Sequence, residues 1–168
     1  MTLNFEKNYA KFRDIEESVA RLKKFGEMSR EDFLADRDGQ DIASFRLIIA
    51  TEAAIDTCLH VSAQLLKTVP EEYTACFHLL AENSLIDIDL AARLAPMVRF
   101  RNLLIHRYWH IDYGRIYEII IGPDLDDLLD FMHQVGRLID QDRCGCRQSR
   151  MFIAEVPYFF LNKSTLTN

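Results

Sequence analysis

One long helical pattern, from Asp41 to Val69, constrains the fold of this chain more than any other feature. Its apolar residues recur at steps of three and four, which places them on one wide face of a helix, and Pro70 ends it. A helix of about 28 residues spans roughly 40 Å at the usual rise per residue. Such a length is typical of a helical bundle, and the wide face suits one partner inside the protomer and one outside it.

Shorter helical patterns precede this segment. An apolar stripe predicts an amphipathic first helix over Asn8 to Phe25. Ser29, with Asp32 three residues later, resembles a capping box for a short helical turn from Arg30 to Ala35. We expect a polar connector over residues 36–40, before the long helix.

Further helical patterns follow it. Pro70 and two glutamates predict the start of a helix that runs to about Asn83. After a turn, another helix is expected from about Asp89, and it tolerates Pro96 only in its first turns or at a kink. Beyond residues 112–114 we predict one bent last helix to about Asp140, although its first part has strand propensity.

Composition fits a single helical domain. The chain has 168 residues, 49% of them hydrophobic, and only 6 glycines and 4 prolines, which argues against disorder and against a turn-rich all-β fold. We therefore predict an all-α protein, a single antiparallel bundle of about five helices over residues 1–142, forming a homodimer. Residues 143–168 are expected to be a C-terminal extension of unknown role.

Several classes of function are disfavoured. The four cysteines show no zinc-finger spacing, the acids after Gly122 are most simply a solvated helix face, and we predict neither a metal nor a cofactor. The N-terminus carries no pattern of a secretory signal, and no apolar run is long enough to span a membrane. A cytoplasmic protein is expected.

The polar residues that interrupt the helix after Pro96 suggest a reaction. Arg101, Asn102, His106 and Tyr108 stand in a segment that is otherwise largely apolar. A guanidinium can bind a phosphate through two hydrogen bonds, and a histidine titrates near neutral pH, so it can move the proton of a 2′-hydroxyl or of a leaving oxygen. Asn102 could orient His106 or donate to the phosphate. The set fits metal-independent cleavage of RNA.

Helix geometry complicates this interpretation. Asn102, His106 and Arg99 lie on one side of an ideal helix, whereas Arg101 lies about 140° from His106. A bend near Tyr108, or a second copy of the helix across a two-fold axis, would bring the two groups to one cleft.

Charge around these residues favours a polyanionic ligand, although the whole chain has a net charge of −6. Five arginines and one acid, Asp112, lie between Arg93 and Arg115, which is a local net charge of +4. Arg99 and Arg107 are candidate RNA-binding residues, and nearby aromatic side chains can stack on unpaired bases.

The spacing R-x4-H-x-Y, here Arg101, His106 and Tyr108, resembles the motif of the HEPN ribonucleases, and its surroundings resemble their HepT-like branch. The resemblance covers roughly Tyr9 to Ile139. It implies the toxin of a type VII-like toxin–antitoxin pair, a dimeric helical bundle that cleaves RNA. It also implies an antitoxin partner, a minimal nucleotidyltransferase that inhibits the toxin by transferring AMP to the motif tyrosine, Tyr108.

Other interpretations remain open from sequence alone. Arg101 could be a structural arginine that pairs with an acid of the long helix, such as Glu52 or Asp56. The whole protein could be a non-catalytic helical partner of a nucleotidyltransferase, or a structural dimer with a polar interface network. Retention of Arg101, His106 and Tyr108 favours the enzyme.

Overall fold

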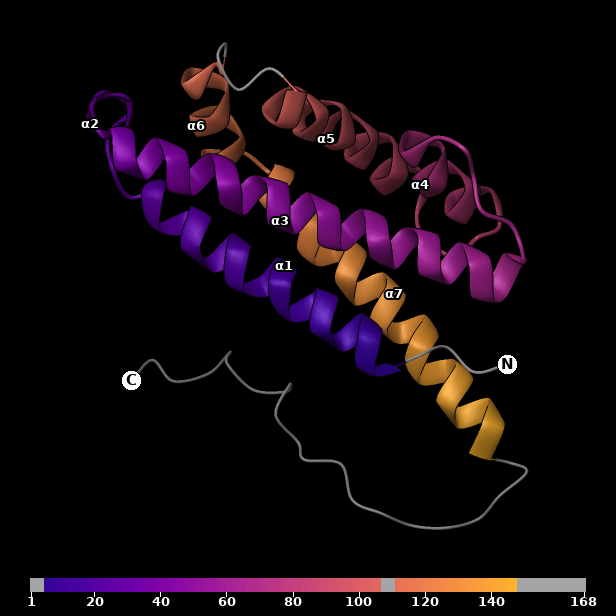
Figure 1. The fold of residues 1–168 in the computed structure, drawn as a ribbon. Helices are drawn as coiled ribbons and strands as arrows, with labels where there is room; N and C mark the ends of the chain where they lie inside the picture. Colours follow the sequence, from indigo (N-terminus) through magenta and orange to yellow (C-terminus); the bar gives the residue numbers. More distant parts are fainter. Residues whose placement is uncertain (1–4, 107–110, 148–168) are drawn as a thin grey trace, which may run out of the picture.

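The computed structural model describes residues 5–106 and 111–147, with side chains at 8–106 and 111–140. This part of the chain forms seven α-helices and one π-helical turn and contains no strand, which confirms the predicted all-α bundle. Four long helices make the bundle, and three short helices sit at its two ends (Figure 1). No helix in the described ranges is both long enough and apolar enough to cross a membrane.

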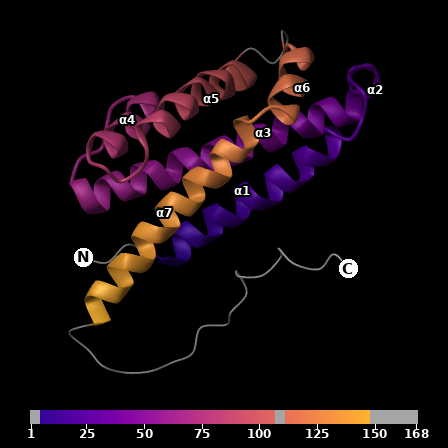
Figure 2. The same cartoon turned by 180° about the vertical axis from the view of Figure 1, so that it is seen from behind.

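Helix α3, from Arg37 to Val61, is the central element. It lies between α1 and α5 at the front of Figure 1, and α7 crosses behind it, as Figure 2 shows from the other side. It begins at Arg37 rather than at Asp41, because the Asp36 side chain accepts a hydrogen bond from the Gly39 amide and caps the helix. The predicted connector over residues 36–40 is therefore wrong.

The end of this segment also differs from the prediction. The α-helix ends at Val61, and a π-helical turn, η1, continues from Ser62 to Leu66. Lys67 then adopts a left-handed conformation with φ of 56°, which ends helical hydrogen bonding before Pro70 is reached.

The first two helices agree with the sequence. Helix α1 runs from Phe5 to Phe25 and packs on α3, with the predicted apolar stripe buried from Phe12 to Leu22 and Tyr9 left exposed. Helix α2 runs from Arg30 to Ala35, and the Ser29 hydroxyl accepts a hydrogen bond from the Asp32 amide, as the capping pattern predicts.

The next two helices begin near their predicted positions. Helix α4 runs from Tyr73 to Glu82, so the segment that starts with Pro70 precedes the helix instead of forming its first turn. Helix α5 runs from Ile88 to His106 and continues through Pro96, which lies well beyond the first turns.

The predicted bent last helix is two helices. Helix α6 runs from Tyr113 to Ile121 and α7 from Asp124 to Arg147, with Gly122 between them. The strand propensity of α6 is overridden because Asp112 caps it and its apolar face packs on α1, α2 and α3. Splitting this segment, and counting α2, raises the number of described helices above the predicted five.

Helix α7 crosses the predicted domain boundary at residue 142, and residues 148–168 of the predicted extension lie outside the described residues. Core packing by described side chains extends from Phe12 to Ile139. Within this core, Phe77 on α4 meets Phe131 on α7 edge to face, with ring centroids 5.2 Å apart.

Candidate active site

The candidate residues lie on the last two turns of α5. Arg99, Arg101, Asn102 and His106 belong to this helix, and His106 is its last residue. Arg107 and Tyr108 lie outside the described residues, so the structure gives no position for the two side chains.

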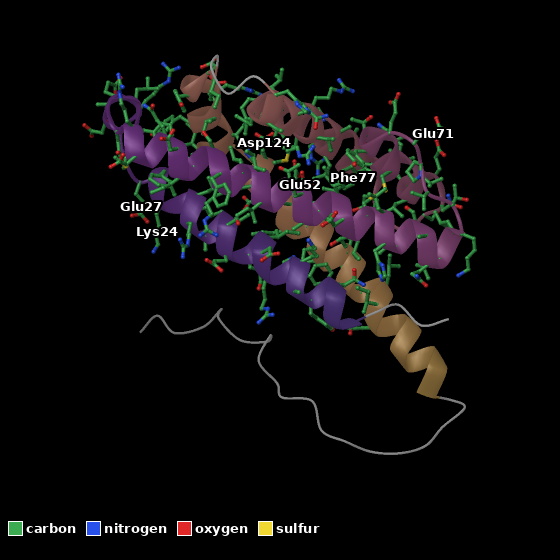
Figure 3. All side chains as sticks on the ribbon, in the orientation of Figure 1. Lys24, Glu27, Glu52, Glu71, Phe77 and Asp124 are labelled. Carbon is green, nitrogen blue, oxygen red and sulfur yellow. The ribbon has the colours of Figure 1, made fainter. Side chains whose placement is uncertain are left out.

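Arg101 faces the interior of the bundle. Its side chain is only 13% exposed, and it shares its side of α5 with the buried Leu94 and Val98. The guanidinium forms an ion pair through Nη2 with Oε1 of Glu52 on α3. Figure 3 labels Glu52 on α3, beside α5. The structural alternative predicted a pairing of Arg101 with an acid of the long helix, and this pairing is present, with Glu52.

Asp56 has a different partner. Its carboxylate pairs with Lys11 on α1, with the Lys11 Nζ atom 2.6 Å from Oδ2. The two acids of α3 therefore make contacts with opposite neighbours, one with α5 and the other with α1.

Asn102 contacts Arg101. Its Oδ1 atom accepts a hydrogen bond of 2.7 Å from Nη1 of Arg101, so its amide helps to fix the guanidinium. The sequence suggests His106 or the phosphate as partners of Asn102 and does not predict this contact, since neighbours in sequence point about 100° apart on an ideal helix.

Burial changes the electrostatics of Arg101. Desolvation lowers the pKa of its guanidinium, because the charged form loses hydration. A guanidinium nevertheless stays protonated near neutral pH. The group is a fixed cation held between a carboxylate and an amide oxygen.

His106 and Arg99 are exposed, on the outward side of α5 with Asn102. The interactions described for Arg101 are with Glu52 and Asn102, not with His106. One protomer therefore presents the arginine inward and the histidine outward, as the helical geometry predicts.

The five arginines between Arg93 and Arg115 form a basic strip in the sequence, and its charge is partly neutralised. Arg93 donates through Nε to Oδ1 of Asp127 at 2.9 Å, and this hydrogen bond raises the pKa of Arg93. Arg115 pairs with Glu118, also at 2.9 Å. Asp127 is buried, so the prediction that it lies on a solvated face is wrong. Among the strip arginines with described side chains, Arg99 is the one for which the structure gives no acidic partner.

Among the described histidines, cysteines, aspartates and glutamates, no three gather closely enough to hold a metal ion. The described end of α5 carries a guanidinium and an imidazole, two groups that can serve in electrostatic and acid–base catalysis.

The fold and these residues define a class, the helical bundles that carry an arginine–histidine motif near the end of one helix. The sequence model of the family described as Ribonuclease HepT-like matches residues 15–135. The chain belongs to this family.

Two characterised relatives share part of the sequence. The tRNA nuclease HepT of Aphanizomenon flos-aquae is 31% identical over 99 residues, which covers 59% of this chain and 67% of that protein. The mRNA nuclease HepT of Shewanella oneidensis is 29% identical over 123 residues, covering 73% of this chain and 90% of that protein.

A solved structure has the same fold. It is the tri-AMPylated HEPN toxin of Shewanella oneidensis in complex with the MNT antitoxin. The similarity has a TM-score of 0.71 and 25% sequence identity, and covers 78% of this chain and 97% of the toxin chain.

Proposed function

We propose that this chain is the ribonuclease toxin of a toxin–antitoxin pair and that it cleaves RNA without a metal ion. The observation that carries the proposal is a guanidinium held charged at the end of α5, five residues before an exposed histidine, in a chain of the HepT-like ribonuclease family. Both named relatives are nucleases that act on RNA.

Arg101 and His106 have separate roles in the proposed reaction. Arg101 binds the scissile phosphate and stabilises the charge that develops on its oxygens. His106 removes the proton of the 2′-hydroxyl, or delivers one to the leaving oxygen, since an imidazole exchanges protons near neutral pH. Arg99, exposed on the same side as His106, and Arg107 would bind neighbouring phosphates.

The site requires two protomers in this proposal. Arg101 points toward α3 and His106 away from the bundle, so a straight α5 cannot direct both at one phosphate. A two-fold axis would bring the end of one α5 to that of the other and complete the cleft.

Regulation by a nucleotidyltransferase antitoxin is the second part of the proposal. The related toxin of Shewanella oneidensis is tri-AMPylated and in complex with the MNT antitoxin. In this chain we assign the modification to Tyr108, two residues after the end of α5. Phosphates added there would occupy the donors of Arg101 and repel the RNA backbone. Both RNA and ATP are available in the cytoplasm, where we propose that the protein acts.

Cleavage by purified variants tests the catalytic assignment. We expect His106→Ala and Arg101→Ala each to abolish cleavage, in the presence of EDTA, of tRNA and mRNA substrates that the wild type cleaves. His133→Ala, which removes an exposed histidine from α7, is the matched control and should cleave normally. Wild-type cleavage by the His106 variant would contradict the assignment.

Mass spectrometry tests the regulation. Incubation with ATP and the cognate transferase should add AMP to the peptide that contains Tyr108, and cleavage should stop. Tyr108→Phe should accept no AMP, whereas Tyr73→Phe, at an exposed tyrosine of α4, should be modified like the wild type. AMP on another residue would show that the tyrosine assignment is wrong.

The alternative function is a non-catalytic partner of the transferase. The same experiments separate the two, because such a partner would bind the transferase without cleaving RNA in any of the assays. The exposed His106 favours the enzyme, whereas the ion pair between Arg101 and Glu52 is expected of a structural arginine as well and does not separate the two functions.

A further inference from the structure

We propose that Glu52 is a positioning residue of the ribonuclease reaction, which holds the Arg101 guanidinium in place while two of its N–H groups remain free for a phosphate. The inference rests on the proposed function. Glu52 lies outside the R-x4-H-x-Y motif, on a different helix, and the motif gives it no role.

The burial of Arg101 explains why it needs a counter-charge. The guanidinium approaches a cavity of about 10 Å³ whose walls include Leu47, Met97 and Leu104. Its Nε atom is buried and has no hydrogen-bond partner among the described residues. A cation removed from water in such surroundings is strongly destabilised unless a carboxylate lies beside it. Glu52 supplies that carboxylate.

The guanidinium keeps suitable donors after it is held. It has five N–H groups, of which Nη1 donates one to Asn102 and Nη2 directs one to Glu52. One N–H therefore remains on each Nη atom, and both can donate to the oxygens of a phosphate. The contacts with Glu52 and Asn102 leave little freedom of rotation, so the two remaining groups keep one direction.

The two possible roles of Glu52, positioning Arg101 and balancing its charge, affect different kinetic parameters. If Glu52 only neutralised Arg101, removing it would strengthen phosphate binding and lower KM. If Glu52 positions Arg101, its removal lets the guanidinium move by an ångström or more, and such misplacement lowers kcat by about 100-fold. The separation of kcat from KM therefore distinguishes the two roles.

Three variants make the test. Glu52→Ala removes the carboxylate, and we expect kcat to fall by about 100-fold with little change in KM. Glu52→Gln keeps the side-chain length and one acceptor oxygen, so we expect a smaller loss, and this variant carries the test if Glu52→Ala does not fold. Asp56→Asn is the matched control, because it weakens an ion pair of the same helix that does not involve Arg101, and its kcat should stay within about twofold of wild type.

Hydrogen exchange of the Arg101 Nε–H group, followed by NMR on the full chain, gives a readout that does not need activity. We expect slow exchange in the wild type, because Nε is buried, and much faster exchange in Glu52→Ala but not in Asp56→Asn. Wild-type kcat or unchanged exchange in the Glu52 variants would overturn the inference. If the wild type itself cleaves no RNA, the proposed function fails, while the exchange rates still test the positioning.

Discussion

At the scale of single residues, burial controls the chemistry of Cys58, one of two cysteines that lie together in the interior. Cys58 on α3 and Cys76 on α4 are fully buried, and the Cys76 sulfur lies 3.5 Å from the Ser62 hydroxyl. Burial raises the pKa of the Cys58 thiol, since a thiolate is poorly solvated there. The thiolate is the nucleophilic form, so Cys58 should be chemically inert in the folded protein.

We therefore expect iodoacetamide to leave Cys58 unmodified in the native protein from pH 7 to pH 9. After denaturation, the same thiol should react as its pKa returns to about 8.5. Peptide mass spectrometry of both samples checks this. Equal modification of the Cys58 peptide with and without denaturant would show that the α3–α4 contact opens readily.

At the scale of elements, two glycines of the C-terminal half differ in the space around them. Gly122 separates α6 from α7, and a Cβ atom there would lie 2.8 Å from the Glu118 carbonyl oxygen, which is part of the α6 backbone and cannot easily move. Gly136 lies inside α7, where a Cβ atom would meet a Phe12 ring carbon at an ordinary 3.8 Å.

Alanine at these positions should have opposite effects. We expect Gly122→Ala to lower the free energy of unfolding by about 1–3 kcal/mol, because the clash is with backbone. Gly136→Ala should change it little or raise it by up to about 1 kcal/mol, since alanine favours a helix. Urea denaturation measures both. Equal stability of the two variants would contradict the geometry of the α6–α7 junction.

At the scale of the whole molecule, α3 leaves an apolar stripe uncovered. Ile42 and Phe45 are 47% and 59% exposed on this helix. Phe45 precedes Glu52 by seven residues, so the stripe runs along one side of α3 toward the ion pair with Arg101. A second protomer that covered this stripe would bury apolar surface and approach the site at the same time.

Phe45→Asp should therefore convert the proposed dimer to a monomer without unfolding it, because the side chain is largely outside the core. The rate of RNA cleavage should fall as the dimer is lost. Light scattering after gel filtration measures the mass, and Ile88→Asp, at a 70% exposed isoleucine that begins α5, is the matched control. A Phe45→Asp protein that stays dimeric would place the interface elsewhere.

Much of the fold follows from local sequence. Apolar periodicity was enough to predict α1 and the central part of α3, and a serine with an aspartate three residues later predicted α2. The early start of α3 was not predicted, and the interaction that decides it is a single cap, in which the Asp36 side chain accepts a hydrogen bond from the Gly39 amide. A cap is one hydrogen bond, and hydrophobic spacing does not reveal it.

The sequence by itself determined the helical class, the family motif and the divergence of Arg101 from His106 around α5, because each depends on residue type and on a fixed rotation per residue. Only the tertiary structure decided which groups meet. Three ion pairs connect different helices: Arg101 with Glu52, Asp56 with Lys11, and Arg93 with Asp127. Such pairings depend on how helices dock, and in a bundle that is decided by packing over whole faces.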